Sequence, residues 1–297
     1  MGEIVECVPN ISEGRNKEVI NSVVESLKLT GAKVLDVSSD PDHNRTVITF
    51  VGDKEVVLKG AFAVAKSAVE LIDLTKHKGT HPRMGAVDVI PFIPIKGVTM
   101  EDCVEISKMV GERIGVELKV PVYLYAESST REERRSLPNI RQGEFEGFFE
   151  KIKDPNWKPD FGPSEVHPTA GVTAVGAREF LIAYNIYLNT KDVNIAEKIA
   201  KSIRESSGGL RFIQAKGMYI EEKGMAQVSM NVLNYKKAPL YRVFEIVKME
   251  AERYGVSVAE SELVGLMPIR AALESLAFYL RFSKLTSDSI IETKMYE

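Results

Sequence analysis

"LRFIQAKGMYIEEKGMAQVSMNVLNY", residues 210–235, predicts two β-strands joined by a tight Glu-Glu-Lys-Gly turn. Upstream, "VNIAEKIAKSIRESS" (193–207) has the apolar spacing of an amphipathic helix and ends before two glycines. Before it, "REFLIAYNIYLN" (178–189) is rich in aromatic and β-branched residues and predicts a strand. The hairpin is therefore preceded by a strand and a helix.

The residues downstream of the hairpin complete the pattern. "PLYRVFEIVKMEAERYG" (239–255) predicts a helix that begins at a proline and ends at a glycine. "VSVAESELVGLM" (256–267) predicts a strand, and "PIRAALESLAFYLRF" (268–282) a closing helix. The second half of the chain thus has the order β-α-β-β-α-β with one extra helix.

The first half of the chain repeats this order and then continues with an extra helix and a strand. Its apolar runs predict strands, its i, i+3, i+4 stripes predict helices, and Gly31 is a good helix stop. The prolines in its fourth strand favour an edge position or an early stop. The expected elements are strand 3–8, helix 16–28, strands 32–38 and 45–52, helix 55–74, strand 86–95, helix 99–117 and strand 120–127.

Two tandem β-α-β-β-α-β half-domains of α/β (α+β) class follow from this order. Each half is expected to be a split-βαβ unit, a mixed sheet with helices on one face. The boundary is expected near residues 175–180, which gives half-domains 1–177 and 178–297. Right-handed crossovers leave one sheet face of each half uncovered. Those faces must be buried against each other, against a partner subunit or against a ligand.

Composition excludes several classes of protein. The 297 residues are 44% hydrophobic and 27% charged, which is typical of a globular protein. A net charge of −3 argues against a nucleic-acid binder that relies on bulk electrostatics. No run reaches the length of a membrane span and the N-terminus lacks a signal-peptide pattern, so we expect a cytoplasmic protein. Cys7 and Cys103 form no disulfide framework and are expected in the core.

"HKGTHPRMGAVDVIPF" (77–92) places two histidines, two glycines and a His-Pro step before a strand. This composition predicts a stiff loop that can hold His81 in one direction. Histidine can take up and return a proton near neutral pH, whereas a surface loop residue is the alternative interpretation of His81. His77 and His81 are four residues apart, but Pro82 and the glycines disfavour a helix there, so no metal site is expected.

A second polar cluster lies in "DVSSDPDHNRTV" (36–47), between two predicted strands. Its aspartates, His43, Asn44 and Arg45 would gather at one rim of the sheet. A polar hairpin turn explains each of these residues equally well.

Two further segments are candidates for binding. "DFGPSEVHPTAGVTAVGAREF" (160–180) is rich in glycine and proline, which predicts a loop whose backbone closely approaches a ligand or the other half-domain. "STREERRSLPNIRQGEFEGF" (129–148) carries Arg131, Arg134, Arg135 and Arg141. A solvated helix face is the default for such a run, and a funnel for an anionic substrate is the sharper alternative.

Seven long segments resemble the glutamate formiminotransferase family, occur in family order and cover the chain from residue 3 to about 282. They are "VECVPNISEG" (5–14), "NRTVITFVG" (44–52), "HKGTHPRMGAVDVIPFIP" (77–94), "VPVYLYAES" (120–128), "LPNIRQGEFEGF" (137–148), "DFGPSEVHPTAGVTAVGAREFLIAYNIYL" (160–188) and "AQVSMNVLNY" (226–235).

The resemblance implies transfer of a formimino group from N-formimino-L-glutamate to N5 of tetrahydrofolate, the co-substrate. It implies two α/β subdomains with a ligand tunnel between them, usually in a homodimer. The catalytic histidine of the family motif corresponds to His81. The folate-binding segment corresponds to Gly162, Pro163, Ser164, Glu165, Val166, His167, Pro168, Thr169, Ala170 and Gly171.

Charged residues near His81 are candidate substrate contacts on chemical grounds. Acidic groups could stabilise the cationic amidine, and arginine suits a bidentate grip on carboxylates. The candidates are Asp36, Asp40, Asn44, Arg45, Lys78 and Arg83. Animal members of the family carry an aspartate where this chain has Ser38, with Asp40 nearby, so an acidic partner at that position is in question.

Two alternative functions stay open at this point, and a third lacks the sequence features that it requires. A glutamate formyltransferase that uses 5-formyltetrahydrofolate would share the scaffold, and a non-catalytic folate-binding subunit could serve a separate cyclodeaminase polypeptide. Bifunctional relatives carry a helical cyclodeaminase domain that does not follow in this sequence. An RNA-binding protein on split-βαβ repeats would need paired aromatic and basic residues on its strands, and these are absent.

Overall fold

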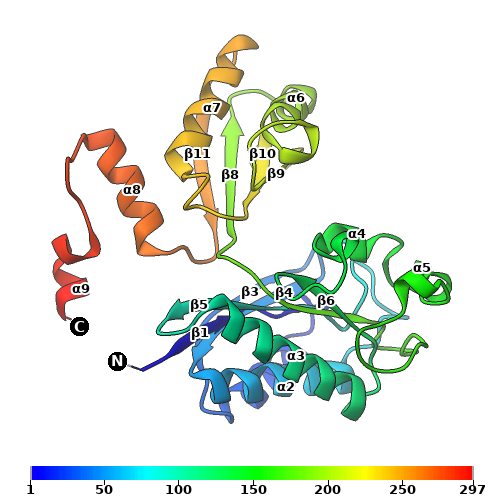
Figure 1. Cartoon of the computed structure of the whole chain (residues 1–297). Helices are drawn as coiled ribbons and strands as arrows, with labels where there is room; N and C mark the ends of the chain where they lie inside the picture. The colour runs from blue at the N-terminus through cyan, green and yellow to red at the C-terminus, as the bar shows by residue number, and fades with distance from the viewer. Residues whose placement is uncertain (1, 296–297) are drawn as a thin grey trace. The chain divides into compact units, whose positions relative to one another are not determined.

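A computed structural model describes residues 2–295. The chain forms two compact units, unit 1 (Met1–Arg178) and unit 2 (Glu179–Glu297) (Figure 1). Each unit has its own buried apolar core around its own sheet. The predicted α/β class is confirmed. Among the described residues, no helix combines the length and apolarity that crossing a membrane requires.

Unit 1 contains a seven-stranded sheet, and its first strand is split in two. The split halves β1 and β2 both lie between β4 and β5, while β3 pairs with β4 on the other side. These pairings are antiparallel, whereas β5, β7 and β6 follow in parallel, so the expected mixed sheet is found here. The strands are β1 (Ile4–Cys7), β2 (Asn10–Ile11), β3 (Lys33–Asp40), β4 (Arg45–Gly52), β5 (Val87–Lys96), β6 (Val122–Ala126) and β7 (Thr173–Ala177).

Three long helices cover one face of this sheet, and α2 and α3 lie side by side on it (Figure 1). α1 buries Ile20, Val23, Val24 and Leu27, which is the stripe that the sequence predicts. α3 begins with a capping box between Thr99 and Asp102. The helices of unit 1 are α1 (Lys17–Lys28), α2 (Lys54–Leu71), α3 (Met100–Glu117) and the short α4 (Leu137–Arg141) and α5 (Glu144–Lys151).

The prolines of β5 neither place it at an edge nor end it early, since the strand runs to Lys96, and that prediction is wrong. β5 is paired on both sides, with β1 and β2 on one and β7 on the other. Pro91 lies opposite the break between β1 and β2, and Pro94 lies next to a register shift in β1. Proline has no N–H group to donate to a neighbouring strand. Where the neighbouring strand is interrupted or shifted in register, the regular pattern of hydrogen bonds is broken, so a central strand tolerates proline at those positions.

β7 lies inside the segment 160–180, which the sequence predicts to be a loop. Its sequence, TAVGA, is buried along its whole length between β5 and β6. A Cβ on Gly176 would lie 2.3 Å from the carbonyl oxygen of Tyr125, so the close approach requires glycine. Small residues have weak strand propensity, and burial on both faces overrides it here.

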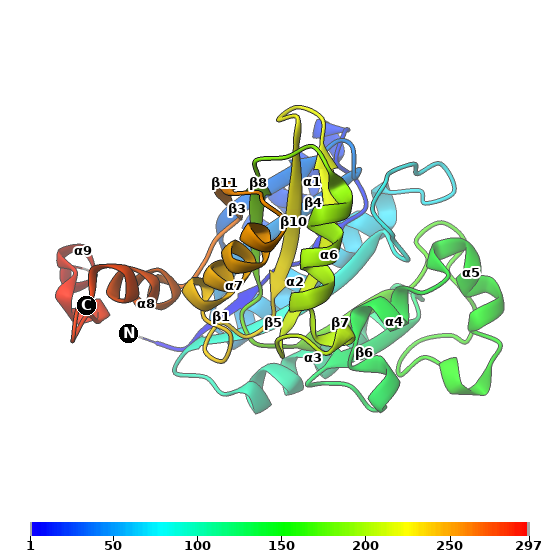
Figure 2. The same cartoon turned by 90° about the horizontal axis from the view of Figure 1, so that it is seen from above.

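Unit 2 has the predicted β-α-β-β-α-β order, with sheet order β11-β8-β10-β9. α6 and α7 pack on the same face of this sheet (Figure 2). All described pairings between the strands of this sheet are antiparallel, so a mixed sheet is found only in unit 1. The elements are β8 (Ile182–Leu188), α6 (Val193–Ile203), β9 (Ile213–Ile220), β10 (Met225–Val232), α7 (Leu240–Arg253), β11 (Val258–Val264), α8 (Ile269–Leu280) and α9 (Ile291–Met295).

The physical reason for the antiparallel sheet is the way the strands interleave. β8 and β9, joined by α6, are separated by β10, which runs opposite to both. A parallel pairing would need the two strands that the helix connects to be neighbours.

Cys7 and Cys103 are both buried free thiols in unit 1, as the sequence predicts.

Candidate functional site

The loop between α2 and β5 carries His77 and His81 and packs on the turn between β3 and β4. The amide of Thr80 donates to the carbonyl of Asp42 at 3.1 Å. A Cβ on Gly79 would lie 2.2 Å from the carbonyl oxygen of His43, so only glycine allows the two segments to approach this closely. The loop is therefore held in place by its backbone.

His81 lies beside two residues of the β3–β4 turn region. The Nη1 group of Arg45 donates to the Nε2 atom of His81. Because arginine can only donate, this Nε2 atom carries a lone pair and a neutral His81 bears its proton on Nδ1. The His43 ring meets the His81 ring edge-to-face at 5.8 Å, and Asp40 holds the His43 Nδ1 atom at 2.5 Å.

The surroundings of His81 favour its neutral form. Burial, and then the positive charges of Arg45 and Arg141, lower the pKa of His81 from its usual 6.5 to about 3. Burial also lowers the pKa of Arg45 to about 10, with a further contribution from Arg141. At neutral pH His81 is therefore an unprotonated base next to two cations.

This lowered pKa predicts a pH-dependent contribution to stability. The unfolded chain takes up a proton at His81 below about pH 6.5, whereas the folded chain does so only near pH 3. The free energy of unfolding should therefore fall as the pH drops through this window, and His81→Gln should reduce the fall. Urea unfolding of both proteins at about pH 7.5 and about pH 5 checks this. Equal pH dependence of the two proteins would contradict the expectation.

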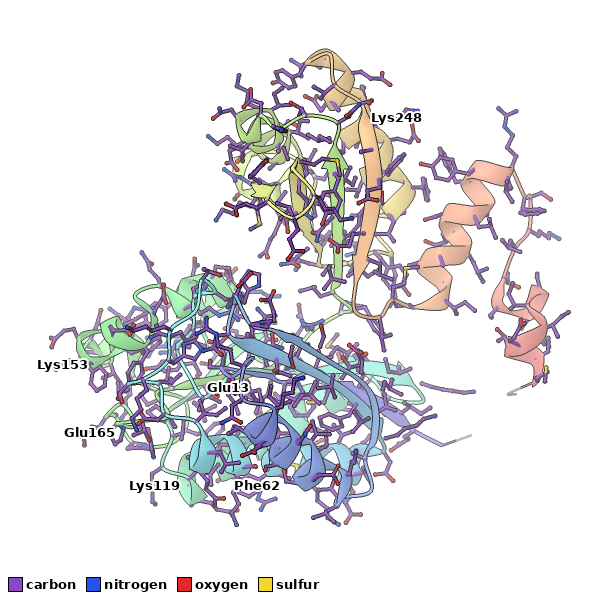
Figure 3. All side chains as sticks on the ribbon, turned by 180° about the vertical axis from the view of Figure 1, so that it is seen from behind. Glu13, Phe62, Lys119, Lys153, Glu165 and Lys248 are labelled. Atoms are coloured by element: carbon purple, nitrogen blue, oxygen red, sulfur yellow. The ribbon has the colours of Figure 1, made fainter. Side chains whose placement is uncertain are left out.

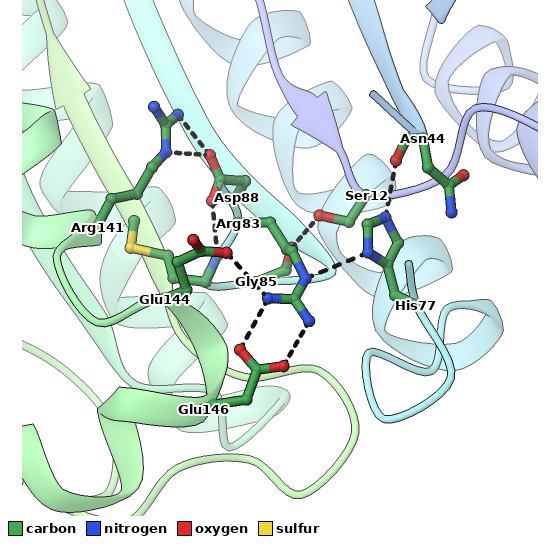
Figure 4. Close-up of polar contacts among 10 residues, drawn as sticks. Ser12, Asn44, His77, Arg83, Gly85, Asp88, Arg141, Glu144 and Glu146 are labelled. Atoms are coloured by element: carbon green, nitrogen blue, oxygen red, sulfur yellow. Dashed lines mark hydrogen bonds and ion pairs between the residues drawn. The ribbon is translucent and has the colours of Figure 1, made fainter. Parts of the chain in front are cut away.

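Arg141 is held at the site by a buried carboxylate. Its Nε and Nη2 groups donate to Asp88 Oδ2 at 2.8 and 2.5 Å, and the amide of Met84 donates to the other carboxylate oxygen at 2.9 Å (Figure 4). Asp88 is 2% exposed. Its carboxylate thus serves Arg141 and the loop backbone.

Arg83 is occupied by other protein groups. Its guanidinium donates to Glu144 at 3.2 Å, to both oxygens of Glu146 at 2.8 and 2.6 Å, and to the Nδ1 atom of His77 at 3.2 Å (Figure 4). Its side chain is only 11% exposed. Each of its three nitrogens therefore has a partner within the protein.

The other candidate substrate residues are spread over the rim. Asp40 lies opposite Arg45 across the β3–β4 pair, whereas Asp36 lies opposite Thr49, four residues further along the strand. That spacing is about 13 Å in a strand, so Asp36 is remote from the Arg45 end. Lys78 is exposed, and its carbonyl accepts a hydrogen bond from the Asn44 side chain at 3.1 Å. Asn44 itself is 7% exposed.

The segment 162–171 contacts the chain both before and after the loop that carries His81. Ala170 accepts a hydrogen bond from the amide of Ala86 at 2.9 Å, and Thr169 accepts one from the amide of Leu74 at 2.8 Å. The His167 Nδ1 atom accepts from the amide of Ala170 at 3.0 Å, so neutral His167 bears its proton on Nε2. Glu165 is exposed in the middle of the segment (Figure 3).

The arginine-rich segment 129–148 is not simply a solvated face, and that default prediction is wrong for two of its members. Arg134 is 1% exposed and binds Asp160 at 2.9 Å. Arg141 binds the buried Asp88. Sequence reasoning therefore missed Arg141 and His43 as neighbours of His81, and only the density of charged residues in their segments signalled them.

Within residues 2–295 no group of three or more His, Cys, Asp or Glu side chains is arranged to hold a metal ion.

Comparison with known proteins gives a consistent result over both units. The model of the formiminotransferase domain, N-terminal subdomain, matches residues 4–178, and that of the formiminotransferase domain matches residues 183–295. The chain is 52% identical to a glutamate formimidoyltransferase of Streptococcus pyogenes serotype M1, over 95% of this chain and 94% of that protein. It is 48% identical to a glutamate formimidoyltransferase of Thermoplasma acidophilum, over 98% and 97%.

A longer relative matches along part of its length. The chain is 49% identical to the formimidoyltransferase-cyclodeaminase of Mus musculus, over 96% of this chain and 54% of that protein. The resemblance stated from the sequence motifs is therefore confirmed.

Proposed function

This chain belongs to the formiminotransferase family, and on that premise we propose that it transfers the formimino group of N-formimino-L-glutamate to N5 of tetrahydrofolate, giving 5-formiminotetrahydrofolate and L-glutamate. Two relatives named glutamate formimidoyltransferase, similar over nearly the full length of the chain, support this activity. Tetrahydrofolate is in this proposal a co-substrate, and no metal takes part.

His81 is the general acid and base of the proposed reaction. Attack of N5 on the amidine carbon forms a tetrahedral intermediate, from which the nitrogen of glutamate must leave as an amine. One group can accept the N5 proton and return it to the leaving nitrogen. The observation that carries this role is the lone pair on His81 Nε2, which accepts a hydrogen bond from Arg45 in a site that keeps the imidazole neutral.

Arg45 is the carboxylate-binding group of the proposal. A substrate carboxylate is a stronger acceptor for its guanidinium than a neutral imidazole is. Once Arg45 turns to a carboxylate, the His81 Nε2 lone pair is free to accept the N5 proton. A bound anion also offsets the positive charge of Arg45 and Arg141, which raises the pKa of His81 and favours its role as an acid.

The segment 162–171 is proposed to bind folate, on the family motif and on its hydrogen bonds to residues 74 and 86 next to the His81 loop. Asp40 is the better placed of the two acidic candidates, since it lies opposite Arg45. We further propose that the catalytic histidine lies in an N-terminal subdomain of residues 1–177, followed by a C-terminal subdomain of residues 178–297. The proposal also includes a homodimer and a cytoplasmic location.

Arg45→Lys should weaken binding of formiminoglutamate. Lysine keeps the charge but loses the planar bidentate fork, and hydrogen bonds to charged groups contribute about 1.5–3 kcal/mol. The KM for formiminoglutamate should therefore rise about 10- to 100-fold, while the KM for tetrahydrofolate changes little. Steady-state kinetics in both substrates check this, with Lys76→Ala as a charged control whose side chain is 83% exposed. An unchanged KM in Arg45→Lys would rule out the carboxylate role.

The activity itself is tested by a spectrophotometric transfer assay with purified protein, tetrahydrofolate and formiminoglutamate. Formation of 5-formiminotetrahydrofolate is the expected result. Activity with 5-formyltetrahydrofolate and glutamate alone would instead indicate a formyltransferase. Folate binding without either reaction would indicate a binding subunit.

A further inference from the structure

We propose that His77 is a positioning residue, which ties α5 to the β3–β4 turn and thereby fixes the geometry of Arg45 and His81. The proposal rests on the proposed function for its kinetic test. His77 lies in the same loop as His81 and has no part in the proposed proton transfer.

Both ring nitrogens of His77 are engaged, and by different elements. The Nδ1 atom accepts from the Nε group of Arg83 at 3.2 Å, and the Nε2 atom lies 2.8 Å from the carbonyl oxygen of Asn44 (Figure 4). Arginine can only donate and a carbonyl can only accept, so the ring must be neutral with its proton on Nε2. Any other protonation state loses one of the two contacts.

Arg83 connects this ring to the start of α5. Its guanidinium is bidentate with Glu146 and also bonds Glu144, and its backbone carbonyl accepts from the amide of Phe145 at 2.9 Å. Bidentate arginine–carboxylate pairs hold both distance and direction. One end of the His77 contact is therefore rigidly attached to α5.

The other end of the contact is Asn44, which directly precedes Arg45. The Asn44 side chain accepts from the amide of Gly14 at 2.9 Å and donates to the carbonyl of Lys78 at 3.1 Å. Its φ of 50° lies in the left-handed region, which asparagine adopts in turns more readily than other non-glycine residues. His77 thus fixes the backbone from which Arg45 reaches His81.

Loss of this tie should reduce the rate of transfer more than substrate binding. Misplacement of a catalytic group by about 1 Å can cost about 100-fold in rate. We expect His77→Phe, which keeps a ring but no nitrogen, to lower kcat about 10- to 100-fold. The KM for formiminoglutamate should rise less than in Arg45→Lys, because the guanidinium is displaced and not removed, and the KM for tetrahydrofolate should change less than about threefold. His77→Gln retains one donor and one acceptor and should restore part of the rate.

A double-mutant cycle separates this role from a general packing role. If His77 acts through Arg83, then His77→Phe combined with Arg83→Lys should cost little more than either single change. Lys76→Ala, in the same loop and well exposed, serves as the control. Additive losses in the cycle, or a His77→Phe variant with the rate of the unmodified protein, would overturn the proposal.

Two measurements by NMR do not depend on turnover. Nitrogen-15 spectra of the unmodified protein should show His77 with a proton on Nε2 only, and the titration of His81 should move in His77→Phe because Arg45 is no longer held. A different tautomer, or an unmoved His81 titration in a folded variant, would refute the positioning role. If the protein transfers no formimino group, these spectra still decide the role of His77 while the proposed function fails.

Discussion

Replacement of His81 by alanine should reduce formimino transfer by about 100- to 10,000-fold, the usual contribution of general acid–base catalysis. The imidazole beside Arg45 is unprotonated at neutral pH, so its lone pair can accept the N5 proton in the substrate complex and return it to the leaving nitrogen. The folate binding that we propose for segment 162–171 should persist, because this segment is held by backbone hydrogen bonds to residues 74 and 86.

Three measurements test this expectation. Single-turnover kinetics give the loss of rate, folate titration gives the affinity, and added imidazole should restore part of the activity of the alanine variant. Lys76→Ala is the matched control in the same loop. A His81→Ala variant that works within about tenfold of the normal rate would show that another group moves the proton.

Replacement of Arg134 by methionine should lower the free energy of unfolding of unit 1 by about 3–5 kcal/mol, the usual cost of breaking a buried ion pair from one side. Arg134 is 1% exposed and donates to Asp160 at 2.9 Å and to the carbonyls of Asn156 and Lys158 at 2.8 and 2.7 Å. Methionine fills much of the space but leaves the carboxylate and both carbonyls without these donors.

The single tryptophan of the chain, Trp157, reports this change directly, since the Arg134 guanidinium lies 5.7 Å from its ring. Urea unfolding followed by its fluorescence gives the loss of stability. Arg135→Ala is the control, because its side chain is 50% exposed and exposed ion pairs contribute about 0–1 kcal/mol. Adding Asp160→Asn to Arg134→Met should recover part of the loss, and no recovery would mean that the unpaired charge is not its cause.

The sequence alone determined the local elements and the motif of the site. The stripe of α1, the turn between β9 and β10 and the proline and glycine that bound α7 each depend on residues close in the chain. Periodicity and turn chemistry are local properties, so they can be recognised without any tertiary contact. The loop that carries His81 could also be recognised from its local composition of histidine, glycine and proline.

The tertiary structure decided what lies next to what. Three features join segments that are distant in the chain. They are the position of β7 between β5 and β6, the central place of β5 in spite of its prolines, and the ion pair of Arg141 with Asp88. No local pattern encodes such pairings, because they depend on which surfaces fill the same space and which buried charges find partners. Packing likewise decided that Arg83 holds Glu146 and His77, while Arg45 points its guanidinium at His81.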